Sequence, residues 1–290
     1  MSTSSRAGRR PWLAGAAAAV LMPLPLLRAR AEDRPVLRFG LTPVFLDERT
    51  RLLQRWRDYL EPALQASVTF VQRGTYGQVM DAVRGGEAHF AWICGYPYVL
   101  HQRELALVAV PQWRGRPLFQ SYLIADATGR VRTLADLRGA SFAYSDPLSN
   151  SGFLYMQHRL RGLGEDSTRF FGRSFFTHSH RHVVEAVAAG LADGGSVDGY
   201  VWETLAELQP ELTARTRVVD RSPDFGFPPI VAGARTEPAR VRAFAAALLA
   251  MSQNPAGQAV LRELRLDRFV SAEPALFAGI AAMARQQAAT

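Results

Sequence analysis

Short apolar runs alternate with amphipathic stretches along the first half of the chain. The runs at 36–40, 67–71 and 89–93 predict strands, because apolar, β-branched and aromatic residues dominate them. Residues 48–64 and 76–84 repeat apolar positions every three or four residues and predict helices. This alternation favours helices packed on a largely parallel sheet.

The same alternation starts again near residue 126. A capped helical turn at 133–139 leads into a new strand. From residue 237 onward the chain is helical, with turns at Asn254-Pro255 and Gly257. The further predicted strands are 106–111, 120–125, 141–144, 173–177, 196–200, 217–219 and 229–234, and the further predicted helices are 151–163 and 182–191.

Two rounds of this pattern predict two α/β lobes. We assign residues 32–125 and 229–290 to the first lobe and residues 126–228 to the second. Lobes of roughly 100 to 150 residues are large enough to bury a core of their own. The expected plan is therefore one lobe, a second lobe and a return to the first.

The first 31 residues have the composition of a secretory signal peptide. Arginines at positions 6, 9 and 10 precede an apolar run at 12–27, and Ala29-Arg30-Ala31 forms a cleavage pattern. The run is shorter than the roughly 20 residues that a membrane-spanning helix needs. We therefore expect export to the periplasm. Arg9-Arg10 resembles a twin-arginine export signal, and Sec export is the alternative.

Charge and cysteine content narrow the class further. The formal net charge is +8, and residues 1–31 hold five arginines and no acid, so subtracting those five leaves +3. This balance does not indicate a nucleic-acid partner. Cys94 is the one cysteine, so no internal disulfide forms and the core alone must stabilise an exported chain.

The segment 142–154 places small polar residues at the start of a helix. A predicted strand and an Asp146-Pro147 turn precede Ser149-Asn150-Ser151-Gly152. The first turn of a helix presents unpaired N–H groups, and the helix dipole adds partial positive charge, so such a start binds phosphate-like oxygens. An ordinary N-cap prefers the same residue types, and both interpretations are open at this point.

This segment resembles the Asp-Pro-x-Ser-x-Ser-Gly-Phe-Leu signature of the phosphonate and phosphite periplasmic binding proteins of ABC transporters, from Asp146 to Leu154. Other family blocks follow in the same order, so the resemblance spans nearly the whole chain after residue 31. Those blocks lie at 177–180, 186–193, 197–198, 225–231 and 254–257.

The resemblance implies a fold and a role. The fold is an α/β, two-lobed type II periplasmic binding protein with the ligand cleft between the lobes, and the crossing strands would lie near 121–126 and 228–233. Closure of the lobes around the ligand is the expected hinge motion. The implied ligand is a phosphonate, phosphite or similar small oxyanion, and no cofactor is implied. The implied partner is an ABC permease, and the binding protein itself is expected to be a monomer.

The resemblance also implies which residues bind. The oxyanion would lie at the 149–152 helix start, with the phenol of Tyr76 donating from the opposite wall. Tyr76 packed under the cleft is the alternative. The complete candidate set is Thr42, Tyr76, Cys94, Gly95, Tyr96, Ser149, Asn150, Ser151, Gly152, His180 and Asp198.

Three histidines at alternating positions, His178, His180 and His182, permit two interpretations. His180 would add a hydrogen-bond donor to the site, or a positive charge when protonated. On a strand, all three would share one face and suggest a metal site. A helix that begins at Arg181 would point them apart, and no nearby cysteine or acid supplies the missing ligands, so we expect no metal.

Asp198, at the end of a predicted strand, matches the family position that faces a cationic group of an aminophosphonate. A carboxylate beside an anion site is repulsive unless it accepts a proton or a cation. Asp198 therefore indicates a zwitterionic ligand or a protonated oxyanion. Capping of the turn at Gly199 is its alternative role. Trp202 nearby would line the pocket or pack beneath it.

Cys94 ends another predicted strand, where many family members have Gly-Pro. Related arsenite-sensing proteins use a cysteine near the cleft, which raises the alternative of a sensor that signals to a membrane histidine kinase. A buried cysteine is more often a small hydrophobe. The Gly95 N–H and Tyr96 are expected cleft contacts.

Ser149, His180 and Asp198 also supply the residue types of a hydrolase triad. The serine does not lie on a Gly-x-Ser-x-Gly elbow, and the order Ser, His, Asp matches none of the common triad families. We therefore expect a binding protein and not an enzyme.

Overall fold

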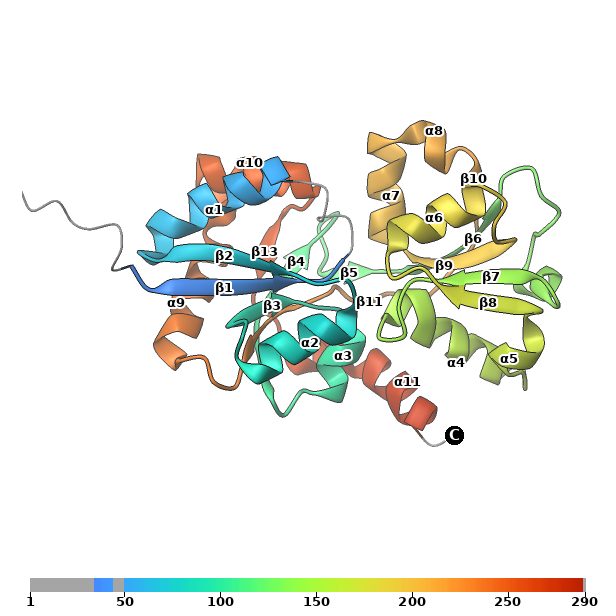
Figure 1. Ribbon diagram of the computed structural model, residues 1–290, viewed down its shortest axis with the longest axis horizontal. Coiled ribbons are helices and arrows are strands. Elements are labelled where there is room, and N and C mark those ends of the chain that lie inside the picture. Colours follow the sequence, from blue (N-terminus) through green and yellow to red (C-terminus); the bar gives the residue numbers. More distant parts are fainter. Residues whose placement is uncertain (1–33, 44–49, 289–290) are drawn as a thin grey trace, which may run out of the picture. The chain divides into compact units, whose positions relative to one another are not determined.

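The computed structural model describes residues 34–43 and 50–288, which form two α/β lobes (Figure 1). The expected signal peptide, residues 1–31, lies outside these ranges. Within them, no helix is long and apolar enough to cross a membrane. The two lobes agree with the two rounds of strands and helices that the sequence predicts.

The first lobe contains a six-stranded mixed sheet with helices on both faces. Its strands are β1 Val36–Leu41, β2 Ser67–Gln72, β3 Phe90–Trp92, β4 Leu105–Gln112, β12 Ile230–Gly233 and β13 Arg268–Val270, and its helices are α1 Thr50–Leu64, α2 Tyr76–Gly85, α3 Gly95–Leu100, α9 Pro238–Leu249, α10 Pro255–Leu264 and α11 Ala278–Ala288. The strand order is β13-β4-β12-β3-β1-β2. β1 is parallel to β2 and β3, and β12 is antiparallel to β3 and β4. α1 and α10 cover one face and α2 covers the other (Figure 1).

The second lobe contains a five-stranded mixed sheet in the order β10-β6-β9-β7-β8. Its strands are β6 Ser121–Asp126, β7 Ser141–Tyr144, β8 Arg173–Phe176, β9 Gly194–Asp198 and β10 Thr216–Arg221, and its helices are α4 Tyr155–Gly162, α5 Ser167–Phe170, α6 His180–Ala188, α7 Gly199–Leu208 and α8 Pro210–Thr213. β7 is parallel to β8 and β9, and β6 is antiparallel to β9 and β10. α6 and α7 lie on one face of the sheet, and α4 and α5 lie on the other (Figure 1).

A small antiparallel sheet lies where the chain passes between the lobes. β5, Leu118–Phe119, pairs with β11, Phe225–Gly226. These short strands directly precede β6 and β12, so the crossings lie a few residues before the ranges 121–126 and 228–233 that the family resemblance suggests. β6, which ends at the predicted lobe boundary, belongs to the second sheet.

Each lobe has an aromatic core. In the first, Phe39 meets Trp56 edge to face at 5.4 Å between ring centroids, and Phe90 stacks on Phe244 at 4.0 Å. In the second, Phe142 stacks on Phe171 at 4.2 Å. Burial of such rings gives each lobe a stabilising core without a disulfide.

Two of the predicted elements start two residues earlier than expected. The helix expected at 182–191 begins at His180, and the strand expected at 196–200 is β9, which starts at Gly194. Glycine disfavours strands, which explains the second error. A Cβ atom at Gly195 would lie 2.5 Å from Val183 Cγ1, so the close packing of α6 on β9 requires glycine there.

Candidate functional site

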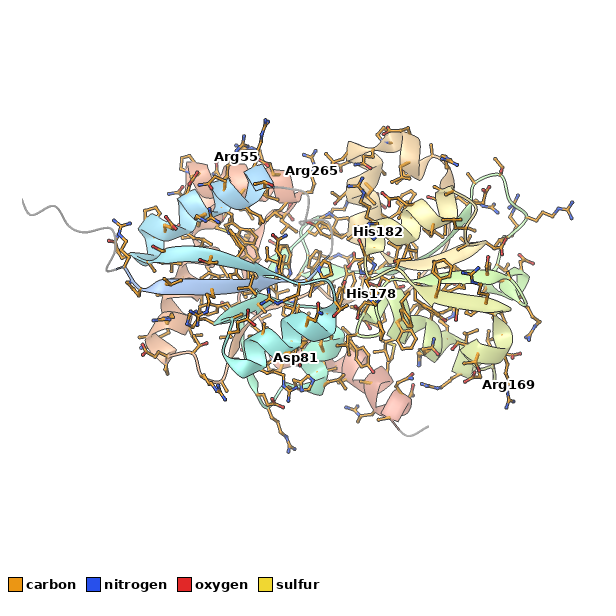
Figure 2. The ribbon with its side chains drawn as sticks, viewed as in Figure 1. Arg55, Asp81, Arg169, His178, His182 and Arg265 are labelled. Atoms are coloured by element: carbon orange, nitrogen blue, oxygen red, sulfur yellow. The ribbon has the colours of Figure 1, made fainter. Side chains whose placement is uncertain are left out.

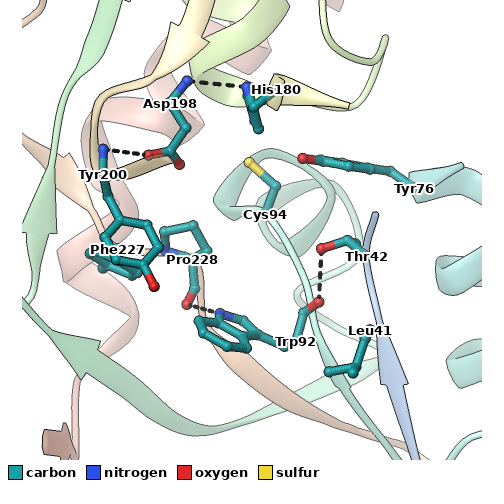
Figure 3. A pocket seen from close by; sticks show the side chains of 10 residues that line it. All are labelled: Leu41, Thr42, Tyr76, Trp92, Cys94, His180, Asp198, Tyr200, Phe227 and Pro228. Carbon is teal, nitrogen blue, oxygen red and sulfur yellow. Dashed lines mark hydrogen bonds between the residues drawn. The ribbon is translucent and has the colours of Figure 1, made fainter. Parts of the chain in front are cut away.

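A small cavity lies at the ends of β3 and β9, and residues of both lobes line it (Figure 3). Its volume is about 30 Å³. One buried water molecule needs about 10–15 Å³ of such volume, so the cavity has room for a few water molecules. The residues that line it are Leu41, Thr42, Tyr76, Trp92, Cys94, His180, Asp198, Tyr200, Phe227 and Pro228. This set joins an aromatic wall to a few polar groups, as is typical of small-molecule sites.

The predicted anion-binding segment forms a helix start beside this cavity. Asn150–Leu154 is a single π-helical turn that continues into α4, and Ser149 is its N-cap. The Ser149 hydroxyl accepts the Gly152 N–H at 2.9 Å. Ser149, Asn150 and Ser151 are fully buried. Among the described residues, the Asn150 amide group and the Ser151 hydroxyl have no hydrogen-bond partner, which is the expected state of a site built for a polar ligand.

Neighbouring strands hold this helix start in place. β6 pairs with β9 so that Ser121 lies opposite Asp198, and the Ser121 hydroxyl donates to the Ser151 carbonyl at 2.6 Å. The Ser145 N–H, directly after β7, donates to the Gly152 carbonyl at 3.4 Å. The helix start is therefore held by a side-chain hydroxyl of β6 and by the backbone directly after β7.

Gly152 is required by this close approach, because a Cβ atom there would lie 1.8 Å from Ser145 Oγ and 3.0 Å from Ser149 Oγ. We expect Gly152→Ala to lower the free energy of unfolding by about 1–3 kcal/mol, the usual cost of overpacking. Gly162→Ala is the control, because nothing lies within 4 Å of its Cβ position and alanine favours a helix. Urea denaturation measures both. Equal stability of the two variants would contradict this account of Gly152.

His180, the first residue of α6, is a neutral donor. Its Nδ1 accepts the Asp198 backbone N–H at 3.1 Å, so the proton of the neutral ring lies on Nε2. Nε2 is 3.5 Å from Ser149 Oγ. Burial lowers the pKa of His180 to about 3. Of the two roles that the sequence allows, the geometry supports the uncharged donor.

Asp198 has two roles at once. Its Oδ1 accepts the N–H groups of Tyr200 at 2.8 Å and Val201 at 3.3 Å, so it caps α7. The same side chain lines the cavity, and Figure 3 shows its second carboxylate oxygen without a hydrogen bond to the residues drawn. Burial raises the pKa of Asp198 to about 7. The capping role is therefore observed, and a contact between Asp198 and a ligand stays a prediction.

Tyr76 reaches the cavity from the opposite lobe. It is the first residue of α2, and its backbone N–H donates to Asp146 Oδ2 at 3.2 Å across the two lobes. Its phenol lies near Cys94 in the cavity (Figure 3). Burial, and then the neighbouring Cys94, Asp146 and Asp198, raise the pKa of Tyr76 well above its ordinary value. The phenol therefore keeps its proton, and its role as a donor to the ligand stays a prediction.

Cys94 meets the helix start directly. Its Sγ accepts the Asn150 backbone N–H at an N···S distance of 3.2 Å. The thiol is free and buried, and burial raises its pKa to about 11. It is therefore a neutral thiol at the point where the two lobes meet.

The other candidates lie around this centre. Thr42 lines the cavity and donates its hydroxyl to the Trp92 carbonyl at 3.3 Å. Gly95 and Tyr96 are buried and are not among the residues that line the cavity. A Cβ at Gly95 would lie 2.6 Å from Ile280 Cδ1, so this position packs against α11. Their role in binding stays a prediction.

The flanking histidines do not join His180. His178 has a left-handed backbone with φ of 59°, and its Nδ1 lies 3.5 Å from Asp146 Oδ2. His182 is exposed on α6 (Figure 2). In the described part of the chain, no three His, Cys, Asp or Glu side chains are arranged to hold a metal ion.

Sequence reasoning did not identify most of the apolar wall. Trp92 Nε1 donates to the Pro228 carbonyl at 2.9 Å, which ties β3 to the segment after the crossing. Tyr200 lies just after β9, and its hydroxyl donates to the Leu264 carbonyl in the first lobe. Trp202, which the sequence leaves either lining the pocket or packed beneath it, is not among the lining residues, and its Nε1 donates to Thr216 Oγ1 at 3.0 Å. An aromatic residue within two residues of a strand's end is the signal that would have indicated Trp92, the last residue of β3, and Tyr200, the second residue after β9.

The chemistry of the site is that of reversible binding. Within the described residues, no arginine lines the cavity, and the donors that surround it are neutral. A buried two-lobed cleft of this kind defines a solute-binding protein.

Comparisons with known proteins agree with this class. Residues 39–277 match the family described as the phosphonate periplasmic substrate-binding proteins of ABC transporters, and the chain belongs to this family. The family consists of substrate-binding proteins and not of enzymes. The two-lobed fold is that of type II periplasmic binding proteins.

Three solved structures illustrate the likeness of fold. PhnD1 from Prochlorococcus marinus, in complex with methylphosphonate, is 18% identical with a TM-score of 0.77, over 88% of this chain and 99% of that chain. The binding protein of an ABC phosphonate transporter from Pseudomonas aeruginosa is 21% identical with a TM-score of 0.77, over 87% and 86%. The periplasmic aliphatic sulphonate-binding protein SsuA from Escherichia coli is 17% identical with a TM-score of 0.56, over 88% of both chains.

Proposed function

We propose that this protein captures a phosphonate, phosphite or similar small oxyanion in the periplasm and delivers it to an ABC permease. The observation that carries the proposal is the pairing of neutral donors with one buried carboxyl group. Tyr76 and His180 offer O–H and N–H groups, and Asp198 lies in the same cavity. The family, and the signal-peptide composition of residues 1–31, support transport and export.

The carboxyl group of Asp198 favours a ligand that carries a proton or a cation. Two anions in one buried cavity repel each other unless a hydrogen or a positive group lies between them. A singly protonated phosphonate or phosphite has a P–OH group that donates to the free carboxylate oxygen, and an aminophosphonate has an ammonium group that does the same. A sulfonate near neutral pH has neither.

Methylphosphonate and methanesulfonate test this selection, because they share shape and differ in that proton. At pH 8, one unit above the pKa of Asp198, most of these carboxyl groups are charged, so we expect singly protonated methylphosphonate to bind roughly 10-fold more tightly than methanesulfonate. Isothermal titration calorimetry with both ligands, and with phosphite and phosphate, is the measurement. Equal or tighter binding of the sulfonate would contradict the role of Asp198. An absence of heat with every oxyanion would refute the transport function.

The alternative role as an arsenite-responsive sensor finds less support. Cys94 does line the cavity, but its pKa of about 11 keeps the thiol protonated, and soft ions bind the deprotonated sulfur. The chain has one cysteine, so a second thiolate ligand is absent from the sequence. We therefore retain transport as the proposed function.

A further inference from the structure

We propose that Cys94 is a specificity-determining residue, whose thiol competes with the ligand for the backbone N–H of Asn150. The inference rests on the proposed binding of an oxyanion. It adds that the protein weakens this binding through a side chain of its own, and that the thiol restricts the size of the ligand.

The contact joins the two halves of the site. Cys94 follows β3 of the first lobe and is the N-cap of α3, whereas Asn150 is the first residue of the π-helical turn in the second lobe. The sulfur and the amide nitrogen are 3.2 Å apart, and both residues are buried. The N–H at this position is one of those that a helix start offers to an anion. The thiol occupies it.

The bond that the thiol makes is weak compared with the one it replaces. A neutral sulfur is a poor acceptor, whereas an N–H that donates to a charged oxygen forms one of the stronger hydrogen bonds in proteins. Burial keeps Cys94 neutral, so no thiolate charge compensates. An oxyanion that gains this N–H must therefore displace the sulfur.

The cavity wall leaves Cys94 as the side chain that can yield. Trp92 is held by its hydrogen bond to the Pro228 carbonyl, and Tyr200 is held by its hydrogen bond to the Leu264 carbonyl. In a cavity the size of a few water molecules, the volume of one side-chain atom is a substantial fraction of the space. The thiol thus limits the volume next to the helix start as well as its hydrogen bonding.

A second observation shows that the same space is suited to a ligand. Asp198 is about 4% exposed, its Oδ1 caps α7, and its other oxygen faces the cavity without a partner among the residues drawn (Figure 3). A buried carboxyl group is rarely left with half of its hydrogen-bonding capacity unused unless a ligand or water completes it. Cys94 and Asp198 therefore border one ligand volume from two sides.

Titration of Cys94→Ala with methylphosphonate tests the proposal. We expect the dissociation constant to fall roughly 10-fold relative to the wild type, because the Asn150 N–H becomes free for a charged oxygen. Cys94→Ser retains an acceptor at this position, so its affinity should stay within about threefold of the wild type. Thr204→Ala is the control, because Thr204 is buried in α7 and does not line the cavity, and it should change the affinity less than about threefold.

The outcomes separate this inference from the proposed function. If the wild type binds methylphosphonate and Cys94→Ala binds it equally or more weakly, the thiol does not compete with the ligand for the Asn150 N–H. The proposed function would then stand, and the thiol would be only a contact between the lobes. Binding by Cys94→Ala alone would support the competition. An absence of binding by both proteins would refute both. If the alanine variant does not fold, Cys94→Gly takes its place, since glycine is tolerated at an N-cap.

Discussion

Replacement of Asp198 by asparagine is expected to remove the preference for phosphonate over sulfonate. The amide group of asparagine donates to an oxyanion where the carboxylate requires a proton or a cation from the ligand. At pH 8, where Asp198 is mostly charged, we expect methanesulfonate to bind about 10-fold more tightly to Asp198→Asn than to the wild type, and singly protonated methylphosphonate about 10-fold more weakly. Calorimetric titration of both ligands against both proteins measures the ratio.

The fold should tolerate this change. Asparagine is as good an N-cap as aspartate, so the carbonyl oxygen of the variant continues to accept the N–H groups of Tyr200 and Val201. Asp193→Asn is the matched control, because Asp193 is exposed, precedes β9 and bonds the Ser141 N–H at 2.8 Å. A selectivity ratio that does not change in Asp198→Asn would show that this carboxyl group does not face the ligand.

Asp198 and His180 are expected to have opposite effects on how the stability of the wild type depends on pH, so that their sum is small. A variant that lacks one of the two should show a strong pH dependence of stability. Asp198 has a raised pKa of about 7 in the folded state against 3.8 for an unperturbed aspartate, so the folded state binds the extra proton and stability falls as pH rises between these values. His180 has a lowered pKa of about 3 against 6.5, so the unfolded state binds the extra proton and stability rises with pH from 3 to 6.5. Between about pH 4 and 6.5 the two effects oppose each other.

Removal of one partner leaves the other effect alone. Asp198→Asn should gain stability as pH rises from 4 to 6.5, and His180→Asn should lose it, each with a slope of at most about 1.4 kcal/mol per pH unit. Urea denaturation at half-unit steps of pH measures the slopes. The other titrating groups are common to both variants, so the difference between the two curves isolates the pair. Parallel curves would contradict the assigned protonation states.

The sequence predicts the layers of this fold better than the edges of its elements. Alternating apolar runs identify β1, β2 and β7 because these strands are rich in β-branched and aromatic residues. β13 was missed, since a three-residue strand between two helices has no period of its own. α3 was missed because glycine and proline occupy its first turn, and these residues usually indicate a loop.

In the candidate site, local features can be predicted from the sequence, whereas contacts between distant residues cannot. The helix start at 149–152 is visible in the sequence because its residues carry both the capping preference and the family signature. The protonation of His180 is not visible, since the Asp198 N–H that fixes its tautomer comes from a strand 18 residues away. The contact between Cys94 and Asn150 spans 56 residues, and only the folded chain brings the two together.

The hydrogen bonds between the lobes have a consequence for how tightly any ligand is held. Tyr76 donates to Asp146, Asn150 donates to Cys94, and Tyr200 donates to the Leu264 carbonyl, all with protein atoms alone. Each such bond stabilises the closed arrangement by about 0.5–1.5 kcal/mol whether or not a ligand is bound. The apparent dissociation constant equals the intrinsic constant divided by the fraction of molecules already closed. These contacts therefore influence how much binding energy is spent on closing the lobes, and substitutions far from the cavity can tune the ligand affinity through that fraction.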